Sequence, residues 1–243
     1  MIPDYTDTDL PRARAICRRA LDGRGDGWLS AADAQEVLAA AGLPLVPTAF
    51  ARTADEAADT AARLGFPVAV KLASRQLVHK TDVGGVRLGL TDEAGVLRAF
   101  AEIRERVGDA MDGVVVQPMV AGGVEVMAGV TQDPLFGPLV AFGLGGIHVE
   151  VLADVCFRVA PLSDRDAAEM VRGIRGFRLL EGYRGHPPAD TAAIEEVLLR
   201  VSRLAEEVPE IREIDLNPIF AFPPGGGCQV ADARIRVHPT AAR

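Results

Sequence analysis

The chain has 243 residues, of which 49% are hydrophobic and 25% are charged, a balance typical of a soluble globular protein with one large domain or two small ones. Its formal net charge of −8 argues against partners that are attracted to the whole surface, such as nucleic acid or an anionic membrane. Any anionic ligand must therefore be held by a local cluster of donors.

The first half of the chain is expected to alternate helices with strands. Ser30, Thr53 and Asp92 are residue types that begin helices by accepting a hydrogen bond from a backbone N–H of the first turn, and Glu56 completes a capping box with Thr53. Apolar runs with flanking prolines or glycines indicate strands. The expected elements are helices over residues 12–21, 30–41, 53–65 and 92–107 and strands over residues 44–50, 67–73, 86–90 and 113–119.

The second half of the chain is richer in strands. The turns DPLFG and PPGGG each separate two strand-like segments, Ser163 and Asp166 form another capping box, and apolar residues recur at helical spacing over residues 191–208. The expected elements are strands over residues 124–133, 138–143, 156–162, 213–222 and 228–235 and helices over residues 163–171 and 191–208. Because many strands are joined by short turns, we expect an α+β fold, not a doubly wound sheet.

The cysteines and the apolar segments indicate a cytoplasmic protein. The first ten residues contain acids and a proline where a secretory signal needs an apolar core, and no apolar run approaches the roughly 20 residues that span a bilayer. The three cysteines, Cys17, Cys156 and Cys228, are widely spaced and lack the pairing of a zinc site. We therefore expect a reduced, cytoplasmic protein that does not enter a membrane.

Two residue types are rare enough to be informative. Of the 26 basic residues only two are lysines, Lys71 and Lys80, and both fall in one ten-residue window, while Asn217 is the only asparagine. Where a sequence avoids a residue type almost everywhere, its few occurrences suggest positions at which a similar residue, such as arginine in place of lysine, would not perform the same role. These three residues are therefore candidates for a functional site, with chance placement as the alternative.

The segment VAVKLASRQLVHKTDVGGVRLGL is the most specific local feature. Lys71 on its first strand offers a compact ammonium that pairs with phosphate as a point charge. Gly84 and Gly85 at the end of the loop allow backbone N–H groups to approach a phosphate without obstruction by Cβ. The sequence contains neither a Walker A loop nor a dinucleotide fingerprint. The alternative is a surface hairpin that carries two solvated lysines.

A second polar feature combines DLNP with VADARI, which places Asp215, Asn217 and Asp232 on two late strands. Alternate residues of a strand face the same side, so Asp215 and Asn217 are expected to point together. Asn217 and Asp232 have the oxygen donors that Mg²⁺ prefers when phosphate and water fill its other positions. The alternative is an asparagine that caps a turn before Pro218 and an ordinary surface aspartate.

Several motifs in a fixed order carry a family resemblance: LASRQLVHKTDVGGV, QPM, VEVMAGVTQDPLFGPLVAFGLGG, EIDLNPI and VADARI. Over roughly residues 28–237 the chain resembles the ATP-grasp subunit or domain of the ADP-forming acetyl-CoA synthetase family, a relative of the succinyl-CoA synthetase β subunit. The resemblance implies an ATP-grasp fold of two α+β subdomains with the nucleotide between them. Residues 1–29 would be a connector, residues 30–120 the nucleotide lid, and residues 121–243 the magnesium and phosphate subdomain.

The resemblance also implies a nucleotide site. Lys71 matches the lysine that binds the ATP phosphates, and Gly84 and Gly85 match the loop that closes over them. Glu125 matches the acid that holds the ribose hydroxyls, and Asn217 and Asp232 match the Mg²⁺ ligands. Residues matching the hinge that receives adenine are Gln117, Met119 and Val120. ATP or ADP with Mg²⁺ are the implied cofactors.

His79 stands where ADP-forming members of the family have a histidine proposed to carry phosphate. A neutral imidazole suits that role because it is a nucleophile near physiological pH. Asp215 resembles the acid that orients this histidine, and Glu150, in FGLGGIHVEVLAD, resembles a group that assists the metal or the histidine. His148 departs from the apolar residues usual at its position. A structural or solvated His79 is the alternative.

The implied function is the ATP/ADP-binding, phosphoryl-transfer component of an ADP-forming acyl-CoA synthetase, which interconverts acyl-CoA, ADP and phosphate with acid, CoA and ATP. The implied partner is a CoA-binding α subunit or fused domain that carries its own phosphohistidine, so a hetero-oligomer is expected. One alternative is a regulatory domain of a protein acyltransferase that binds a nucleotide as a sensor without converting it. Another is an ATP-grasp carboxylate–amine ligase, against which the HKTDVGG loop argues.

Overall fold

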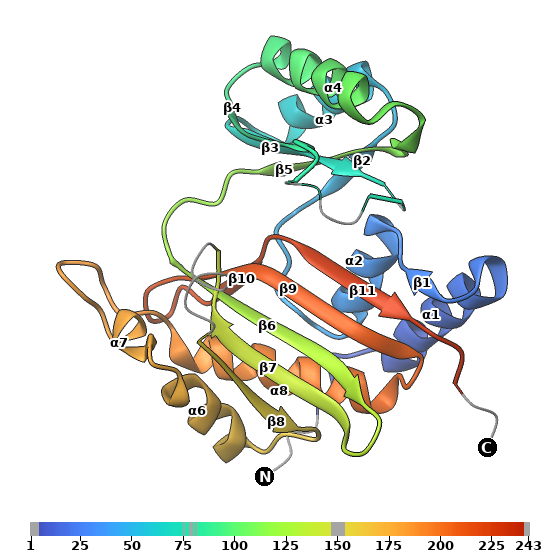
Figure 1. Cartoon of the computed structure of the whole chain (residues 1–243). Helices are drawn as coiled ribbons and strands as arrows, with labels where there is room; N and C mark the ends of the chain where they lie inside the picture. Colours follow the sequence, from blue (N-terminus) through green and yellow to red (C-terminus); the bar gives the residue numbers. More distant parts are fainter. Residues whose placement is uncertain (1–4, 75, 78–79, 81, 147–153, 241–243) are drawn as a thin grey trace. The chain divides into compact units, whose positions relative to one another are not determined.

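The computed structural model describes residues 5–74, 76–77, 80, 82–146 and 154–240 (Figure 1). The chain divides into two compact units. Unit 1 comprises residues 1–29, 33–45 and 122–243, and unit 2 comprises residues 30–32 and 46–121.

A seven-stranded antiparallel sheet forms the centre of unit 1. Its strands follow the order β1-β11-β9-β6-β7-β8, and β10 pairs with β9 beside this path. The strands are β1 (Gly27–Trp28), β6 (Val124–Asp133), β7 (Gly137–Leu144), β8 (Val155–Val159), β9 (Ile211–Ala221), β10 (Cys228–Val230) and β11 (Ala233–Val237).

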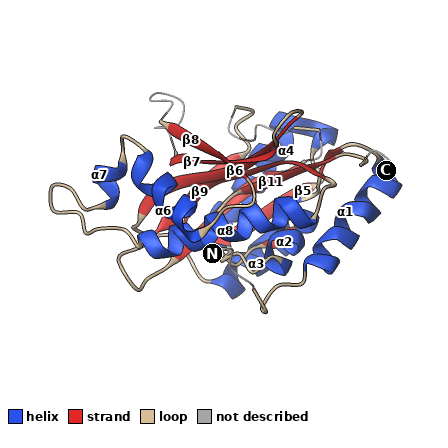
Figure 2. Cartoon of the chain, turned by 90° about the horizontal axis from the view of Figure 1, so that it is seen from below, coloured by secondary structure: helices blue, strands red, loops and turns tan. Residues whose placement is uncertain are grey.

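Helices cover one face of this sheet and leave the other face for polar residues. Figure 2 shows α1, α6 and α8 on the same side of the strands. Along β6, Val126 and Val130 enter the core with α8, whereas Glu125 lies on the opposite, exposed face. The helices of unit 1 are α1 (Leu10–Arg24), α2 (Ala31–Ala40, which starts in unit 2), α6 (Asp164–Gly173), α7 (Phe177–Leu180) and α8 (Thr191–Glu207).

Unit 2 is a four-stranded antiparallel sheet with helices α3 and α4 packed against it. Apolar residues of β3 and β5 alternate into the core that they share with these helices. The elements are β2 (Ala49–Ala51), β3 (Val68–Ala73), β4 (Val86–Leu90), β5 (Gly113–Pro118), α3 (Ala54–Leu64), α4 (Glu93–Val107) and the short 3₁₀ helix η1 (Gly108–Ala110).

The capping signals in the sequence are confirmed at three helices. Thr53 and Asp92 accept hydrogen bonds from backbone N–H groups at the starts of α3 and α4, and Ser163 with Asp166 forms a complete capping box on α6. At α3 the carboxylate of Glu56 accepts from the backbone N–H of Arg52 at 2.7 Å, one residue before the expected partner. The predicted amphipathic helix over residues 191–208 is also confirmed as α8.

Some expected elements differ from the structure in extent. The strand expected over residues 228–235 is interrupted between β10 and β11, because the Ala231 N–H donates to the Pro218 carbonyl at 3.0 Å while Asn217 donates to Asp232 at 3.2 Å. The strand expected over residues 44–50 is reduced to β2, and β1 and α7 are additional elements. Short elements such as these depend on contacts with distant parts of the chain, which local sequence patterns do not report.

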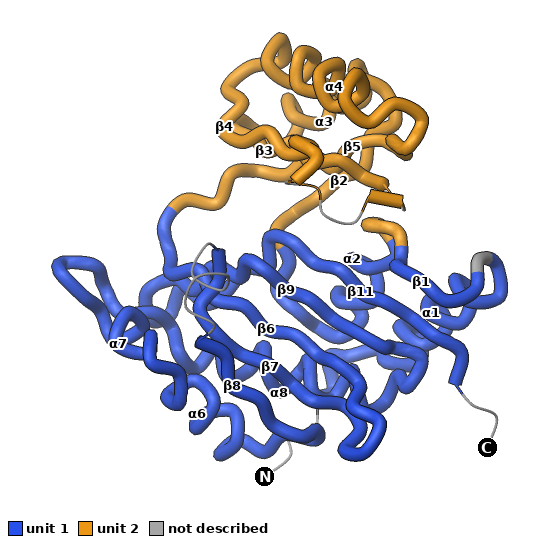
Figure 3. Tube along the Cα trace, in the orientation of Figure 1, with its two compact units in different colours: residues 1–29, 33–45, 122–243 blue, residues 30–32, 46–121 orange. Residues whose placement is uncertain are grey.

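The division into units differs from the expected subdomains (Figure 3). Residues 1–29 were expected to form a separate connector, and residues 33–45 were expected to belong to the first subdomain. Both segments belong to unit 1. Two contacts explain this: the Val230 N–H donates to the Pro44 carbonyl at 2.8 Å, and Leu45 forms a β-bridge with Val230. Arg14 and Arg18 on α1 likewise donate to the buried carboxylate of Glu210 at 3.0 and 2.7 Å.

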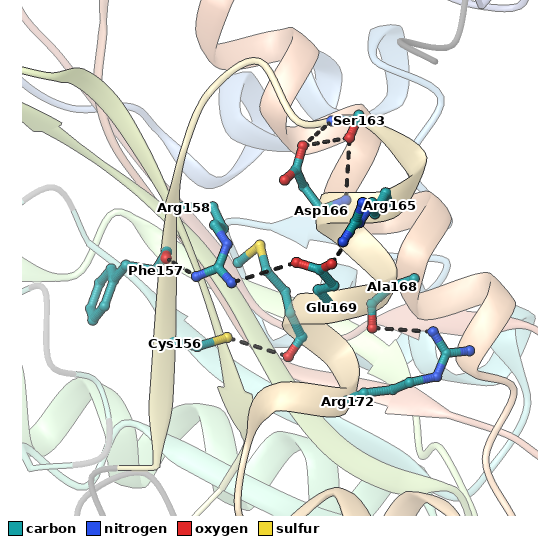
Figure 4. A network of polar contacts seen from close by, with 10 residues as sticks. Cys156, Phe157, Arg158, Ser163, Arg165, Asp166, Ala168, Glu169 and Arg172 are labelled. Atoms are coloured by element: carbon teal, nitrogen blue, oxygen red, sulfur yellow. Dashed lines mark hydrogen bonds and ion pairs between the residues drawn. The ribbon is translucent and has the colours of Figure 1, made fainter.

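Polar contacts connect β8, one of the two edge strands of the unit 1 sheet, to α6 (Figure 4). Arg158 on β8 lies 4.0 Å from Glu169 on α6, and Glu169 also pairs with Arg165 at 2.7 Å. The Cys156 thiol donates to the Met170 carbonyl at 3.4 Å. Phe157 points the other way, onto the uncovered face, where it is 52% exposed. Strand β8 therefore has one face tied to the helical layer and one open face.

Among the described residues, no helix combines the length and the apolar character required to cross a bilayer.

Asp190 holds together the start of α8 and the turn between β9 and β10. Its carboxylate accepts from the backbone N–H groups of Ala193, Gly225 and Gly227 at 3.1, 2.8 and 3.2 Å. Burial raises the pKa of Asp190, but these three hydrogen bonds outweigh it and hold the pKa below its ordinary value. The carboxylate therefore stabilises the fold at neutral pH.

We expect Asp190→Ala to lower the free energy of unfolding by about 1–2 kcal/mol, the usual effect of losing a helix cap. Asp190→Asn should lower it less, because one side-chain oxygen is retained. Because the folded pKa is depressed, the difference between the wild type and Asp190→Asn should persist above the unfolded pKa of about 3.9 and vanish as pH falls through the folded value. Urea titrations at pH 7 and pH 3 measure both effects; a difference that grew on acidification would contradict this role.

Candidate functional site

Lys71 is a buried cation in unit 2. It lies on β3, where it pairs with Val86 of β4 and Val115 of β5, and it is only 8% exposed. Its neighbours Val70 and Leu72 enter the core shared with α3 and α4, so Lys71 lies on the other face of the sheet. The sequence predicts a lysine on this strand, and the burial of Lys71 does not fit the alternative of a hairpin with two solvated lysines, whereas Lys80 is half-buried. Contact between Lys71 and phosphate stays a prediction.

Gln117 is a second buried polar side chain on the same sheet face. It lies on β5 opposite Ala69, diagonally across from Lys71, and is 5% exposed. Five polar or charged residues are buried in the described part of the chain, and two of them share this face. Polar groups in such water-poor surroundings interact more strongly with a charged ligand than they would in solvent.

Gly84 and Gly85 close the loop between β3 and β4. The Gly85 N–H donates to the Lys80 carbonyl at 2.7 Å, and the Gly85 carbonyl accepts from Leu72 at 2.6 Å. A Cβ on Gly85 would lie 2.8 Å from the Leu72 Cβ, so a larger residue does not fit there. Arg87 donates to the Gly84 carbonyl at 2.8 Å. This geometry gives the pair a packing role; contact with phosphate stays a prediction.

Met119 and Val120, the residues expected to receive adenine, follow β5 at the end of unit 2. Both are half-buried, and the Met119 N–H donates to the Pro67 carbonyl at 2.9 Å. Because that N–H is engaged within the unit, a contact between Met119 and a base would use its carbonyl group or its side chain. Their role remains a prediction.

Strand β9 carries the polar residues of unit 1. Ile214 and Leu216 are buried in the core, so Asp215 and Asn217 share the opposite face, as the alternation predicts. Asp215 pairs with Gly129 of β6 and with Arg234 of β11. Asp215 therefore lies on a strand that is paired on both sides, and one of its two cross-strand neighbours is a glycine.

The turn after β7 contacts residues of two other strands, β6 and β9. The Gly146 N–H donates to Oδ1 of Asn217 on β9 at 3.1 Å. Gly146 has a φ of +62°, and a Cβ there would collide with the carboxylate of Glu125 on β6. The preceding Gly145 N–H donates to the Glu125 carbonyl at 2.8 Å. The FGLGG turn thus packs directly against Glu125 and Asn217.

Asn217 and Asp232 are also adjacent, since the Asn217 N–H donates to the Asp232 carbonyl at 3.2 Å. Asp232 Oδ1 accepts from the Ala233 N–H at 3.1 Å. An amide oxygen and a carboxylate are donors that suit Mg²⁺, which takes only one or two protein ligands when a nucleotide supplies others. Within the described ranges, no group of three or more His, Cys, Asp and Glu side chains is arranged to hold a metal. The pair fits the few-ligand arrangement.

Two predicted catalytic residues, His79 and Glu150, lie outside the described residues, as does His148. Their roles stay predictions. The hydrogen bond between Gly146 and Asn217 was not anticipated, because it joins residues 71 positions apart. The available signals were the glycine pair of FGLGG and the single asparagine, but nothing local in the sequence connects them.

The sequence matches the ATP-grasp domain family over residues 20–237. It is 45% identical over 241 residues to the ADP-forming acetate–CoA ligase I of Archaeoglobus fulgidus, covering 96% of this chain and 34% of that protein. The β subunit of the ADP-forming acetate–CoA ligase II of Pyrococcus furiosus is 43% identical over 84% of this chain and 89% of the subunit. The chain thus spans about a third of the first relative and most of the second.

A solved structure of similar shape is acetyl-coenzyme A synthetase 1 of Ca. Korarchaeum cryptofilum, in complex with coenzyme A and Mg-AMPPCP and with its phosphohistidine segment pointing towards the nucleotide binding site. It is 40% identical with a TM-score of 0.81, covering 93% of this chain and 100% of that one. The expected α+β ATP-grasp fold is therefore confirmed. The chain belongs to the ATP-grasp domain family, in the group formed by the β subunits and β-type domains of ADP-forming acetate–CoA ligases.

Proposed function

We propose that this chain is the ATP/ADP-binding, phosphoryl-transfer component of an ADP-forming acyl-CoA synthetase. The overall reaction converts acyl-CoA, ADP and phosphate into the free acid, CoA and ATP, and it is reversible. The observation that carries the proposal is the hydrogen bond from Gly146 to Asn217, which places the FGLGG turn, Glu125 and Asn217 together beside Asp232. A glycine-rich turn next to oxygen donors suits a phosphate and its metal ion.

Unit 2 would supply the groups that hold the phosphates and the base. The buried ammonium of Lys71 pairs with phosphate oxygens, and its low exposure strengthens that attraction relative to a lysine in water. Gln117 on the same face, with the backbone of Met119 and Val120, would receive the adenine. These groups bind the same negatively charged ligand, so they would act as a set.

Unit 1 would supply the groups for the ribose and the metal. Glu125 accepts hydrogen bonds from ribose hydroxyls, while Asn217 and Asp232 would bind Mg²⁺ with phosphate oxygens completing its shell. Bound Mg²⁺ supplies neutralisation of the phosphate charge. The contact with Gly146 orients the Asn217 amide, because the acceptor in that hydrogen bond must be its oxygen.

His79 would be the phosphoryl carrier. Its imidazole nitrogen attacks the phosphorus of a phosphohistidine on the partner, so a new N–P bond forms at His79 as the donor's N–P bond breaks. An ADP β-phosphate oxygen then attacks this phosphorus, which forms the O–P bond of ATP and releases neutral His79. Asp215 would hold the imidazole in the required orientation, and Glu150 would assist the metal or the histidine. The remaining catalysis is positioning and charge neutralisation.

The partner would be a CoA-binding component, either a separate α subunit or a fused domain. Support comes from the relatives, since one is named as a β subunit and another is a single protein about three times the length of the matched region. The chain would act in the cytoplasm as part of a hetero-oligomer.

The first test removes the Lys71 ammonium. Lys71→Met should lower acetyl-CoA-dependent ATP formation, measured with the CoA-binding component, by about 10²–10³-fold, as loss of one preorganised charge contact does in other enzymes. Arg98→Met, an exposed cation on α4 of the same unit, serves as the control and should leave the rate within about twofold. Thermal unfolding confirms that both variants fold; a Lys71→Met enzyme with normal activity would remove the phosphate contact from the proposal.

The second test follows phosphate on His79. After incubation with Mg²⁺ and ATP labelled at the γ-phosphate, acid-labile label should appear on the wild type and be absent from His79→Asn, because the amide side chain cannot form a phosphoramidate. ATP binding by the same variant should persist. His238→Asn is the control and should label normally; label of equal intensity on His79→Asn would exclude His79 as the carrier.

The third test separates metal binding from nucleotide binding. Asn217→Leu removes the amide oxygen, so the Mg²⁺ concentration that half-saturates nucleotide binding should rise by about 10–100-fold, whereas binding of ADP without Mg²⁺ should change little. Asn217→Asp keeps an oxygen acceptor for the Gly146 N–H and should retain metal dependence near the wild type. Calorimetric titration of ADP at several Mg²⁺ concentrations measures both; equal losses with and without Mg²⁺ would point to a structural defect instead.

A further inference from the structure

A basic and aromatic surface lies on unit 1 outside the candidate site. It is formed by residues 175–186, that is, the end of the α6–α7 junction, α7 and the loop that follows, and we call it the arginine hook. In Figure 1 this segment, drawn in orange, projects from the margin of unit 1. Arg175, Arg178 and Arg184 are exposed, and Glu181 is the only acid in the segment. A local excess of positive charge therefore stands on a chain whose net charge is −8.

The cations of the hook are arranged around one aromatic ring. The guanidinium carbons of Arg178 and Arg184 lie 5.9 and 5.3 Å from the ring centroid of Tyr183, which is itself 39% exposed. These are distances at which a cation is attracted to the face of a ring. Among the described residues, Arg175, Arg178 and Arg184 form no ion pair with an acid. Their charges are thus available to a binding partner.

The backbone of the hook is held in a defined shape. The Asp154 carboxylate accepts from the N–H groups of Arg175 and Gly176 at 2.8 and 2.6 Å. After α7, the Ala189 N–H donates to the Leu180 carbonyl at 2.8 Å. A surface that is ordered before binding loses less conformational entropy when a partner docks. The arginines are therefore presented by a braced loop.

Arg184 adopts a backbone conformation that disfavours its own side chain. Its φ is +49°, and it is the only residue other than glycine with a positive φ in the described part of the chain. Glycine or asparagine takes up this conformation more readily than a long side chain does. A strained arginine at an exposed turn suggests that its guanidinium has a function that a less strained residue would not perform.

We propose that the arginine hook is the docking surface for an acidic face of the CoA-binding component, an inference that rests on the proposed function. Arginine and tyrosine are among the residues that contribute most strongly at protein–protein interfaces, and Leu179, 37% exposed, adds apolar area beside them. Exposed guanidiniums favour a partner surface rich in carboxylates. The composition of the hook thus fits a folded protein partner with complementary charge.

The position of the hook favours the CoA-binding component as the partner. Asp154, which braces the hook, directly precedes Val155, and Val155 pairs with Gly143 on the strand that leads into the FGLGG turn. The partner must exchange a phosphoryl group with the site built on that turn. The docking surface and the site are both held by the strand pair β7 and β8. A partner docked on the hook would therefore be positioned relative to the site.

The test titrates the CoA-binding component, supplied as a separate chain, into this chain with acetyl-CoA, ADP, Mg²⁺ and phosphate. Arg178→Glu combined with Arg184→Glu should raise the partner concentration for half-maximal ATP formation at least tenfold, with the maximal rate unchanged. Wild-type association should weaken as salt rises, and the variant should show a smaller salt dependence. Arg98→Glu combined with Arg104→Glu on α4 makes the same change in net charge elsewhere and is the matched control.

The outcomes are distinct. If the wild type forms no ATP with the partner, the proposed function itself is wrong. If the wild type is active and the hook variant needs no more partner than it does, the docking inference is overturned. An equal shift in the control variant would assign the effect to net charge and overturn it as well. ADP binding to the isolated hook variant, measured by calorimetry, should match the wild type; a loss there would show damage to the nucleotide site instead of the docking surface.

Discussion

The hydrogen bond from the Gly146 N–H to Oδ1 of Asn217 is the contact on which the candidate site in unit 1 depends. It fixes which end of the amide is the oxygen, and a carbonyl oxygen has a second lone pair that stays available to a metal ion. The bond requires a glycine, because φ is +62° and the Glu125 carboxylate occupies the place of a Cβ. One backbone group therefore positions two side chains from different strands.

The strand register determines which residues can reach such a site. On β9, burial of Ile214 and Leu216 forces Asp215 and Asn217 onto the uncovered face. On β3, Val70 and Leu72 enter the core with α3 and α4, so Lys71 lies on the opposite face of that sheet, where it is also buried. A slip of one residue would exchange the apolar and polar residues between the two faces of the strand and remove the apolar set from its core. The free energy of the core therefore also secures the geometry of the site. The alternation of side chains along a strand therefore links the packing of the core to the orientation of the polar residues.

Those features that depend on short-range patterns could be predicted from the sequence. Thr53, Asp92 and Ser163 act through N–H groups three residues away, and alternation on β9 involves only neighbouring residues. The pairing of Gly146 with Asn217 and the attachment of Leu45 to Val230 join distant segments, so no local pattern indicates them. Lys71 was identified by its rarity, yet its burial depends on three strands that come together only in the fold.

The cations of this acidic chain lie in two different environments. Lys71 is buried, where a charge interacts strongly with a phosphate and where water does not compete. The guanidiniums of the arginine hook are exposed, so salt and water screen them and each contributes little by itself. Buried charge therefore suits tight binding of a small ligand, whereas an exposed cluster braced by Asp154 suits the association and orientation of a large one. The same chain places one type of cation in each setting, which would let the proposed nucleotide site and the proposed docking surface bind their ligands separately.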